Sequence, residues 1–600
     1  MTVDDMSKTA SDKIKTTATP HLEHWTIDPL AMVAVVGLAA KSAYVAIASV
    51  GVDGALSIVG VALWAGLYFA VVVRAGRGVR SVATIITALL LSVVLWVDLV
   101  HLRAFGSVVN YAALGSGLTL DDLGPSIAAL VAPWDVLLLL DVFVLVMLAS
   151  RRPYPRGLRL AKPRKGLGRL GVALACAFAL LSLFQLPRVP VDQDARMLFG
   201  GPLGLHLNQV TMLTLPSTDD LTESERQDVQ AWFTANREHA AAVPPDGKHA
   251  GVLSGKNVYL VVVESLESMV LDLEVDDQEI TPRINALMDE GLVFTDIAQQ
   301  VREGTTSDGE LLILTSMYPL DSGSAFLRYP YAAYGVTLPK LLRQISYSAV
   351  ALHGDAASFW NRDVVFPRLG WSDYVSQEDF EHAPESGLGV LDGALFDQAL
   401  IEIGRESSPH LMMLSTITSH IPWRLPDDLQ GLELSKDDIS SDYLQALHYT
   451  DAQLGRFYDE LGRRGLLDRA AFVIVGDHEG IHRYRSKDTW LPDNDMRIPF
   501  IVHVPGMEQQ IIDTPGGQVD ILPTLAYLLG IPAEDYADGV MGRNLFGADG
   551  GSAIDSQGHV RAAVGNVQLL ENAVRVSGMT LRGGYFAGTE HDTTVLSQER

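Results

Sequence analysis

The chain has 600 residues, which is too long for a single domain, and its net charge of −27 argues against nucleic acid as a partner. Apolar residues make up 48% of the sequence and the mean hydropathy is +0.18, so part of the chain is expected to lie in lipid. The only cysteine, Cys176, excludes a disulfide within the chain and a cysteine-rich metal site.

Apolar stretches dominate the first third of the chain. Residues 1–26 are polar and are predicted to form a disordered cytoplasmic tail. Five apolar stretches follow, at about 30–50, 55–73, 81–101, 133–150 and 169–187. Each approaches the ~20 residues that cross a bilayer. One such stretch is also typical of a buried helix in a soluble protein, but five in succession favour a five-helix transmembrane domain over residues 27–187.

Basic residues are unevenly distributed among the loops between these stretches. Arginine and lysine gather after the second stretch, at 74–80, and after the fourth, at 151–165. The other two loops, near Asp53 and Asp121, lack such clusters. The positive-inside rule places basic loops in the cytoplasm. We therefore expect a multi-pass protein of a bacterial cell membrane with a cytoplasmic amino terminus and an extracellular chain after Pro187.

Three charged residues interrupt the apolar stretches, namely Lys41, Asp98 and Asp141. A charge within a bilayer is costly and usually faces the interior of a helix bundle. Two interpretations stay open for these residues. They pair helices with one another, or they contact a lipid headgroup or glycerophosphate.

A connector at residues 188–255 is expected to be extracellular. Helical periodicity covers residues 221–237, and Thr222 with Glu225 three residues later is the capping-box pattern that starts helices. Three alanines ending at Ala242 have the small-residue form of a signal-peptidase site, although three alanines also occur by chance. Release by cleavage after Ala242 is thus a further expectation.

Strand and helix patterns alternate over residues 256–600, which predicts an α/β domain with a mostly parallel central sheet. The last fifty residues are interpreted as glycine-rich turns and short β-like runs that end the same domain. The expected strands and helices are at 258–263, 349–352, 411–414, 472–475 and 500–503, and at 281–290 and 443–462, respectively.

Two of these strands end in residues that bind metals. The run 258–263 ends in Glu264, and 472–475 leads into Asp477 and His478. Open α/β sheets bind ligands at the carboxyl ends of their strands. A hydroxyl on Thr306 would complete the site, because metal coordination activates a poor nucleophile. Singly, each residue has an ordinary alternative, such as a solvent-exposed strand end, a helix cap or a turn. Oxygen ligands with one nitrogen suit manganese or magnesium.

Six segments in this order resemble the lipoteichoic acid synthases, which are membrane phosphoglycerol transferases of the alkaline phosphatase and sulfatase superfamily. The segments are 257–268, 304–310, 353–363, 418–420, 476–480 and 517–524. The resemblance runs from roughly Leu30 to Phe546. It implies a sulfatase-like extracellular domain, a Mn²⁺ cofactor, and Thr306 as both metal ligand and nucleophile. The sequence departs from the family at Thr305, where lysine is common, so a cation beside the phosphate is missing.

The resemblance also implies a substrate site formed by His353, Trp360, Arg362 and His420. Arginine is suited to bidentate recognition of phosphate. Tryptophan can cover the glycerol carbons, and histidine can hydrogen-bond a phosphate or protonate a leaving oxygen. An isolated histidine more often has a structural role, and it is the family resemblance that assigns His353 and His420 to the substrate site.

The function expected from these residues is transfer of glycerophosphate from phosphatidylglycerol to Thr306, with release of diacylglycerol. The glycerophosphate then passes to a polyglycerolphosphate chain or a glycolipid acceptor. Two half reactions at one nucleophile predict ping-pong kinetics. The alternatives are phosphoethanolamine transfer or sulfate-ester hydrolysis on the same fold, and a non-catalytic polymer-binding protein. Residues 304–310 lack the cysteine or serine pattern that sulfatases mature, and every catalytic position is filled.

Overall fold

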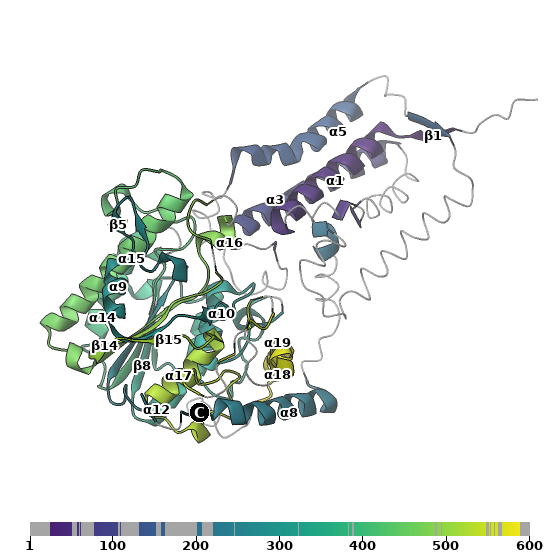
Figure 1. Cartoon of the computed structure of the whole chain (residues 1–600). Coiled ribbons are helices and arrows are strands. Elements are labelled where there is room, and N and C mark those ends of the chain that lie inside the picture. Colours follow the sequence, from purple (N-terminus) through teal and green to yellow (C-terminus); the bar gives the residue numbers. More distant parts are fainter. Residues whose placement is uncertain are drawn as a thin grey trace, which may run out of the picture. The chain divides into compact units, whose positions relative to one another are not determined.

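The chain forms two compact units, residues 1–97 with 133–208, and residues 98–132 with 209–600 (Figure 1). The structure is a computed structural model. It describes residues 24–50, 57–58, 60–61, 77–105, 108–109, 131–151, 158–161, 201–206 and 220–587, with gaps at 245–246, 322, 382, 387–388, 486–488, 494, 548–550, 553, 557 and 562–566.

The described part of the first unit is mainly helical. Its elements are α1 (Pro29–Val50), α3 (Arg77–Phe105) as far as residue 97, η4 (Pro133–Leu139), which leads into α5 (Leu140–Ser150), and the antiparallel pair β1 (His24–Ile27) and β2 (Leu158–Ala161). Among the described residues, three segments are long and apolar enough to cross a membrane: Pro29–Ser49, Val79–Arg103 and Pro133–Ser150. They match the first, third and fourth predicted spans. The predicted stretch at 169–187 and most of that at 55–73 lie outside the described residues.

A buried ion pair joins the helices of this unit. The Nζ atom of Lys41 on α1 lies 2.8 Å from Oδ2 of Asp141 on α5. The same ammonium donates a hydrogen bond to Oγ of Ser92 on α3, at 2.7 Å. Gly37 permits this approach, because a Cβ atom there would lie 2.5 Å from the Asp141 side chain. For Lys41 and Asp141 the structure therefore has the pairing of one helix with another, which was the first of the two interpretations of these charges.

The second unit is organised around an eight-stranded sheet. Its spatial order is β15 (Gln510–Ile512), β6 (Glu290–Phe294), β14 (Phe500–Glu508), β13 (Ala470–Gly476), β3 (Asn257–Val263), β12 (His410–Ser415), β8 (Ser348–His353) and β9 (Asp373–Val375). The strands from β13 to β9 run parallel, whereas β14 is antiparallel to both of its neighbours. The predicted mostly parallel sheet is confirmed.

Both faces of the sheet are buried. Val258, Leu260 and Val262 of β3 belong to one apolar core, and Tyr259 and Val261 to the other. A central strand covered on both faces needs a continuous apolar run, which is what the sequence supplies. Figure 1 shows the covering helices on the two sides of the sheet. One layer contains α9 (Pro282–Met288), α14 (Asp392–Glu402) and α15 (Ile439–Arg463), and the other α10 (Thr305–Thr315), α12 (Leu338–Gln344), α13 (Arg362–Leu369) and α17 (Ile521–Leu528).

Short elements connect this framework. They are the strand pairs β4 (Glu274–Val275) with β5 (Gln278–Glu279), β10 (Glu385–Ser386) with β11 (Gly389–Val390), and β7 (Ile297–Ala298) with β16 (Gly516–Gly517), and the helices α11 (Ala325–Arg328) and α16 (Ile481–Arg485).

Helix α8 (Glu223–Ala240) precedes the sheet and packs into the second unit. Its capping box at Thr222 is present as predicted. The indole of Trp232 donates a hydrogen bond to the carbonyl oxygen of Leu569 at 2.8 Å, and Arg582 pairs with Glu225 at 2.6 Å.

Two predicted segments differ from the structure. The helix expected at 281–290 ends at Met288, because Glu290 already begins strand β6 of the eight-stranded sheet. The carboxyl-terminal segment, predicted as turns and β-like runs, contains the helices α18 (Val567–Glu571) and α19 (Ala573–Arg582). The buried residues Ala573, Val576 and Met579 recur at helical spacing and pack into the core, which explains the helix.

Candidate active site

Strand register brings the two candidate carboxylates together. Gly476 at the end of β13 lies opposite Val263 at the end of β3, so Asp477 and Glu264 leave neighbouring parallel strands at the same edge. The backbone N–H of Ser265 donates a hydrogen bond to Oδ1 of Asp477 at 2.7 Å. Both carboxylates are almost fully buried.

A loop after β12 holds Glu264 in place. The backbone N–H of Glu264 donates to Oγ1 of Thr416 at 3.0 Å, and Oγ of Ser419 donates to the carbonyl oxygen of Glu264 at 2.6 Å. The hydroxyl of Ser265 donates to Oε1 of Glu264 at 2.7 Å. Both main-chain groups of Glu264 are therefore fixed, and Oε2 is left to face Thr306.

His478 presents Nε2 to the same carboxylates. Its Nδ1 atom donates to the carbonyl oxygen of Glu479 at 2.6 Å, because a carbonyl can only accept. Nε2 lies 3.4 Å from Oε1 of Glu264 and 3.4 Å from Oδ2 of Asp477. Burial lowers the pKa of His478, so the ring is neutral and Nε2 carries a free lone pair.

The donor set of Glu264, Asp477 and His478 fits a divalent cation. One ligand atom from each residue lies within 4.8 Å of the others, and all three residues are buried. Within the part of the chain that the structure describes, Oδ2 of Asp477 is buried without a hydrogen-bond partner. Burial, and then the nearby Asp477, raise the pKa of Glu264 well above its usual range. Two buried carboxylates so close together need a compensating positive charge.

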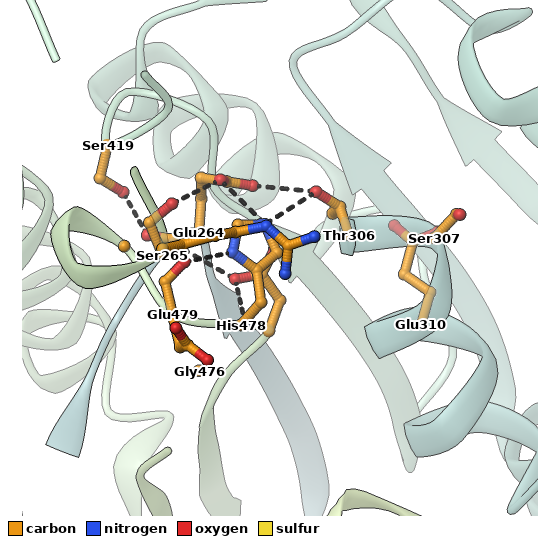
Figure 2. A network of polar contacts seen from close by, with 12 residues as sticks. Glu264, Ser265, Thr306, Ser307, Glu310, Ser419, Gly476, His478 and Glu479 are labelled. Carbon is orange, nitrogen blue, oxygen red and sulfur yellow. Dashed lines mark hydrogen bonds and ion pairs between the residues drawn. The ribbon is translucent and has the colours of Figure 1, made fainter. Parts of the chain in front are cut away.

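The hydroxyl of Thr306 points at this donor set from the first turn of α10 (Figure 2). Its Oγ1 atom donates to Oε2 of Glu264 at 3.1 Å and lies 3.5 Å from Nε2 of His478. The neighbouring hydroxyl of Ser307 is engaged elsewhere, with the carbonyl oxygen of Gly304 at 2.7 Å and with Oγ of Ser324 at 2.7 Å. Geometry thus separates Thr306 from the next hydroxyl in the chain.

Thr305 and Gly309 shape the start of this helix. Thr305 has a φ of +43°, an uncommon conformation for a β-branched residue, and it lines the same pocket as Thr306. Gly309 faces the metal-ligand loop, since a Cβ atom there would lie 3.0 Å from the carbonyl oxygen of Asp477. The absence of a side chain at Gly309 lets α10 approach the donor set.

The four predicted substrate residues meet in one pocket with the candidate nucleophile. The residues that line it are Glu264, Thr305, Thr306, His353, Asp355, Phe359, Trp360, Arg362, Ile417 and His420. Trp360 and Asn361 both have left-handed backbone angles, φ +57° and +56°, which form the sharp turn before Arg362 opens α13.

The two histidines of the pocket are held by main-chain carbonyls. Nδ1 of His353 donates to the carbonyl oxygen of Ser415 at 2.9 Å, and Nδ1 of His420 to that of Ile421 at 2.7 Å. Burial lowers the pKa of both rings, that of His420 to about 4. Both rings are therefore neutral near pH 7 and offer Nε2 as a hydrogen-bond acceptor.

Two carboxylates in the site were given no role by the sequence. Glu310 and Asp355 are both buried, and both lie against the guanidinium of Arg362. Both stand inside segments that carry the family resemblance. The available signal for Glu310 was its spacing, four residues after Thr306 on a helix, which places both on one helix face.

A sulfatase family model matches residues 256–531, and these hold the sheet and every residue of the site. The second unit is therefore a sulfatase-type domain. A model described as the lipoteichoic acid synthase N-terminal domain matches residues 11–191. Over these two stretches together the chain is similar to the lipoteichoic acid synthases.

Individual relatives cover most of the chain. Lipoteichoic acid synthase 1 of Bacillus subtilis is 27% identical over 501 residues, 78% of this chain and 76% of the relative. Lipoteichoic acid synthase of Staphylococcus aureus (strain USA300) is 25% identical over 487 residues, 76% and 73% of the two chains. The solved lipoteichoic acid synthase LtaP of Listeria monocytogenes is 24% identical with a TM-score of 0.49, and the match covers 60% of this chain and 98% of that one.

Proposed function

We propose that this chain is a membrane-anchored, metal-dependent phosphoglycerol transferase. It takes glycerophosphate from phosphatidylglycerol and passes it to a polyglycerolphosphate or glycolipid acceptor. The observation that carries the proposal is the Thr306 hydroxyl, which lies 3.1 Å from Glu264 in a pocket that also contains Arg362. The relatives named as lipoteichoic acid synthases support the substrate class.

The first half reaction releases diacylglycerol. Oγ1 of Thr306 attacks phosphorus, the bond from phosphorus to the diacylglycerol oxygen breaks, and that oxygen leaves with a proton. Glu264 accepts the hydrogen bond of the Thr306 hydroxyl and is the nearest group to take its proton. Arg362 supplies guanidinium N–H groups for the phosphoryl oxygens.

The second half reaction restores the enzyme. A hydroxyl of the acceptor attacks phosphorus, the bond to Oγ1 of Thr306 breaks, and Thr306 recovers a proton. The neutral rings of His353 and His420 can accept a hydrogen bond from the incoming hydroxyl through Nε2. Trp360, which lines the pocket, is suited to cover the glycerol carbons.

Glu264, Asp477, His478 and Thr306 would hold the metal ion. When bound, a divalent cation supplies positive charge for the phosphoryl oxygens and lowers the pKa of the threonine hydroxyl. Mn²⁺ is the proposed ion and Mg²⁺ the alternative, because three oxygen ligands and one imidazole suit both. Elemental analysis of the purified protein, followed by chelation and re-addition of each ion, tests this assignment.

Headgroup-labelled phosphatidylglycerol tests the reaction. The wild type is expected to release diacylglycerol and to carry glycerophosphate on the peptide that contains Thr306. Thr306→Ala should do neither. Thr315→Ala is the matched control, since Thr315 is buried in the same helix and its hydroxyl donates a hydrogen bond to the carbonyl oxygen of Leu311 in the preceding turn. Normal turnover by Thr306→Ala, or turnover only of phosphatidylethanolamine or a sulfate ester, would overturn the proposal.

The topology is part of the same proposal, with a cytoplasmic amino terminus and an extracellular sulfatase-type domain. The basic loops at 74–80 and 151–165 support it. A reporter that is active only outside the cell should be active after Arg600 and silent after Arg80. The reverse pattern would contradict this orientation.

A further inference from the structure

An ion pair within the site links the nucleophile helix to the arginine of the pocket. Nε of Arg362 donates to both carboxylate oxygens of Glu310, at 3.1 and 3.2 Å. Glu310 is 0% exposed and Arg362 is 1% exposed. A buried pair of this kind has little rotational freedom, because each partner would be an uncompensated charge if it turned away.

Glu310 and Thr306 share one helix. They are four residues apart on α10, so they lie on the same face about 6 Å apart along its axis. Figure 2 shows both side chains on this helix. The helix therefore holds the candidate nucleophile and, through Glu310, the arginine. Any shift of α10 moves both together.

The two Nη atoms of Arg362 make no hydrogen bond to Glu310. Only Nε is bound by Glu310, while Nη1 lies 3.6 Å from Oδ2 of Asp355 and has no hydrogen-bond partner among the described residues. Arg362 lines the pocket that contains Thr306. The guanidinium fork is rigid and planar, so fixing Nε fixes the direction of every other N–H group.

We propose that Glu310 is a positioning residue that orients the Arg362 guanidinium relative to the Thr306 hydroxyl. The inference rests on the proposed function, because it takes Arg362 to bind the phosphoryl group. Glu310 itself touches neither the phosphoryl group nor the reacting hydroxyl. Its effect on the reaction runs through Arg362 alone.

Glu310→Gln is the variant that tests this role. Glutamine keeps the size and one acceptor oxygen but loses the charge and the second acceptor for Nε. We expect kcat to fall at least tenfold, whereas KM and the Kd for inorganic phosphate change less than threefold, since the Arg362 charge remains in the pocket. Bound metal should be unchanged. Glu402→Gln is the matched control, because Glu402 is also a buried helical glutamate paired with an arginine, Arg405, outside the site.

A double-variant cycle separates positioning from a merely structural role. Arg362→Lys keeps the charge but removes the fork that Glu310 holds. The double variant Glu310→Gln with Arg362→Lys should therefore have a kcat less than threefold below that of Arg362→Lys alone. If the fold-losses of kcat in the two single variants multiply in full in the double variant, the proposal is overturned. An unchanged kcat in Glu310→Gln, or loss of bound metal from that variant, would overturn it as well.

A second substrate, the chromogenic phosphodiester bis(p-nitrophenyl) phosphate, allows the positioning role of Glu310 to be tested separately from the proposed function. Wild-type cleavage of this diester without cleavage of phosphatidylglycerol would overturn the proposed lipid reaction and leave the Glu310 comparison measurable on the diester. Equal kcat of the wild type and Glu310→Gln on a diester that both cleave would overturn the positioning role alone. Cleavage of neither substrate by the wild type would overturn both.

Discussion

Gly309→Ala is predicted to damage the metal site through one methyl group. Glycine in a helix interior is about 0.5–1 kcal/mol less favourable than alanine, so the substitution would stabilise an unobstructed helix. At Gly309 the new Cβ would lie 3.0 Å from the carbonyl oxygen and 3.3 Å from Cβ of Asp477. Relieving such overpacking costs about 1–3 kcal/mol. We expect a net loss of stability of about 0–2.5 kcal/mol by combining these terms.

Gly578→Ala is the control for this substitution. Gly578 also lies inside a helix, α19, but an added Cβ would meet no atom of the described residues within 4 Å. The free energy of unfolding of this variant should rise by about 0.5–1 kcal/mol, because alanine favours a helix more than glycine does. The two alanine variants should thus differ by about 1–3 kcal/mol in unfolding free energy, the overpacking term.

Thermal unfolding of the full chain, bound metal and diacylglycerol release are the three measurements. Gly309→Ala should unfold at a lower temperature than Gly578→Ala. It should also bind metal more weakly and lose most activity, because Asp477 must shift by a few tenths of an ångström. A Gly309→Ala protein as stable and as active as Gly578→Ala would refute the argument that this glycine serves close approach to the donor set.

Three further predictions concern charges. Glu264→Gln should lose bound metal and diacylglycerol release while its thermal unfolding stays near that of the wild type; full metal content would remove Glu264 from the site. In the first unit, Lys41→Met alone should lower the free energy of unfolding by about 3–5 kcal/mol, since it leaves the buried Asp141 carboxylate without its positive partner. The double variant Lys41→Met with Asp141→Leu should recover most of this loss in a detergent-unfolding assay. Burial raises the pKa of Asp451 to about 7, above its unfolded value. The folded state therefore binds this proton more tightly, so denaturation at pH 8, 6 and 5 should show the wild type gaining stability relative to Asp451→Asn as pH falls.

The sheet and the donor set were predictable because their signals are local. A fully buried parallel strand needs an uninterrupted apolar run, and the run at β3 is followed directly by Glu264. The parallel pairing of β13 with β3, which the structure supplies, then brings Asp477 beside Glu264. The direction of the Thr306 hydroxyl, by contrast, depends on where α10 sits over the strand ends, which no local pattern specifies.

The Glu310 contact and the carboxyl-terminal helices were missed for different reasons. Glu310 and Arg362 are 52 residues apart, and a single glutamate gives no sign of its distant partner. Helix α19 contains Gly578 and follows glycine-rich sequence, so its local propensity is weak. Tertiary packing stabilises it, because Val576 lies in the core that also receives Trp232 of α8.

Helix α8 also bears on the consequence of the predicted cleavage after Ala242. A peptide bond broken after Ala242 lies beyond the end of α8, whose Val229, Trp232 and Phe233 are in the core of the sulfatase-type domain. Asn236 adds hydrogen bonds from its side chain to the carbonyl oxygens of Val540 and Met541. After such a cut, α8 would stay packed against the sulfatase-type domain. These non-covalent contacts alone would then join the domain to the rest of the chain before Ala242. Free diffusion would then require either undocking of α8 or a second cut on its amino-terminal side.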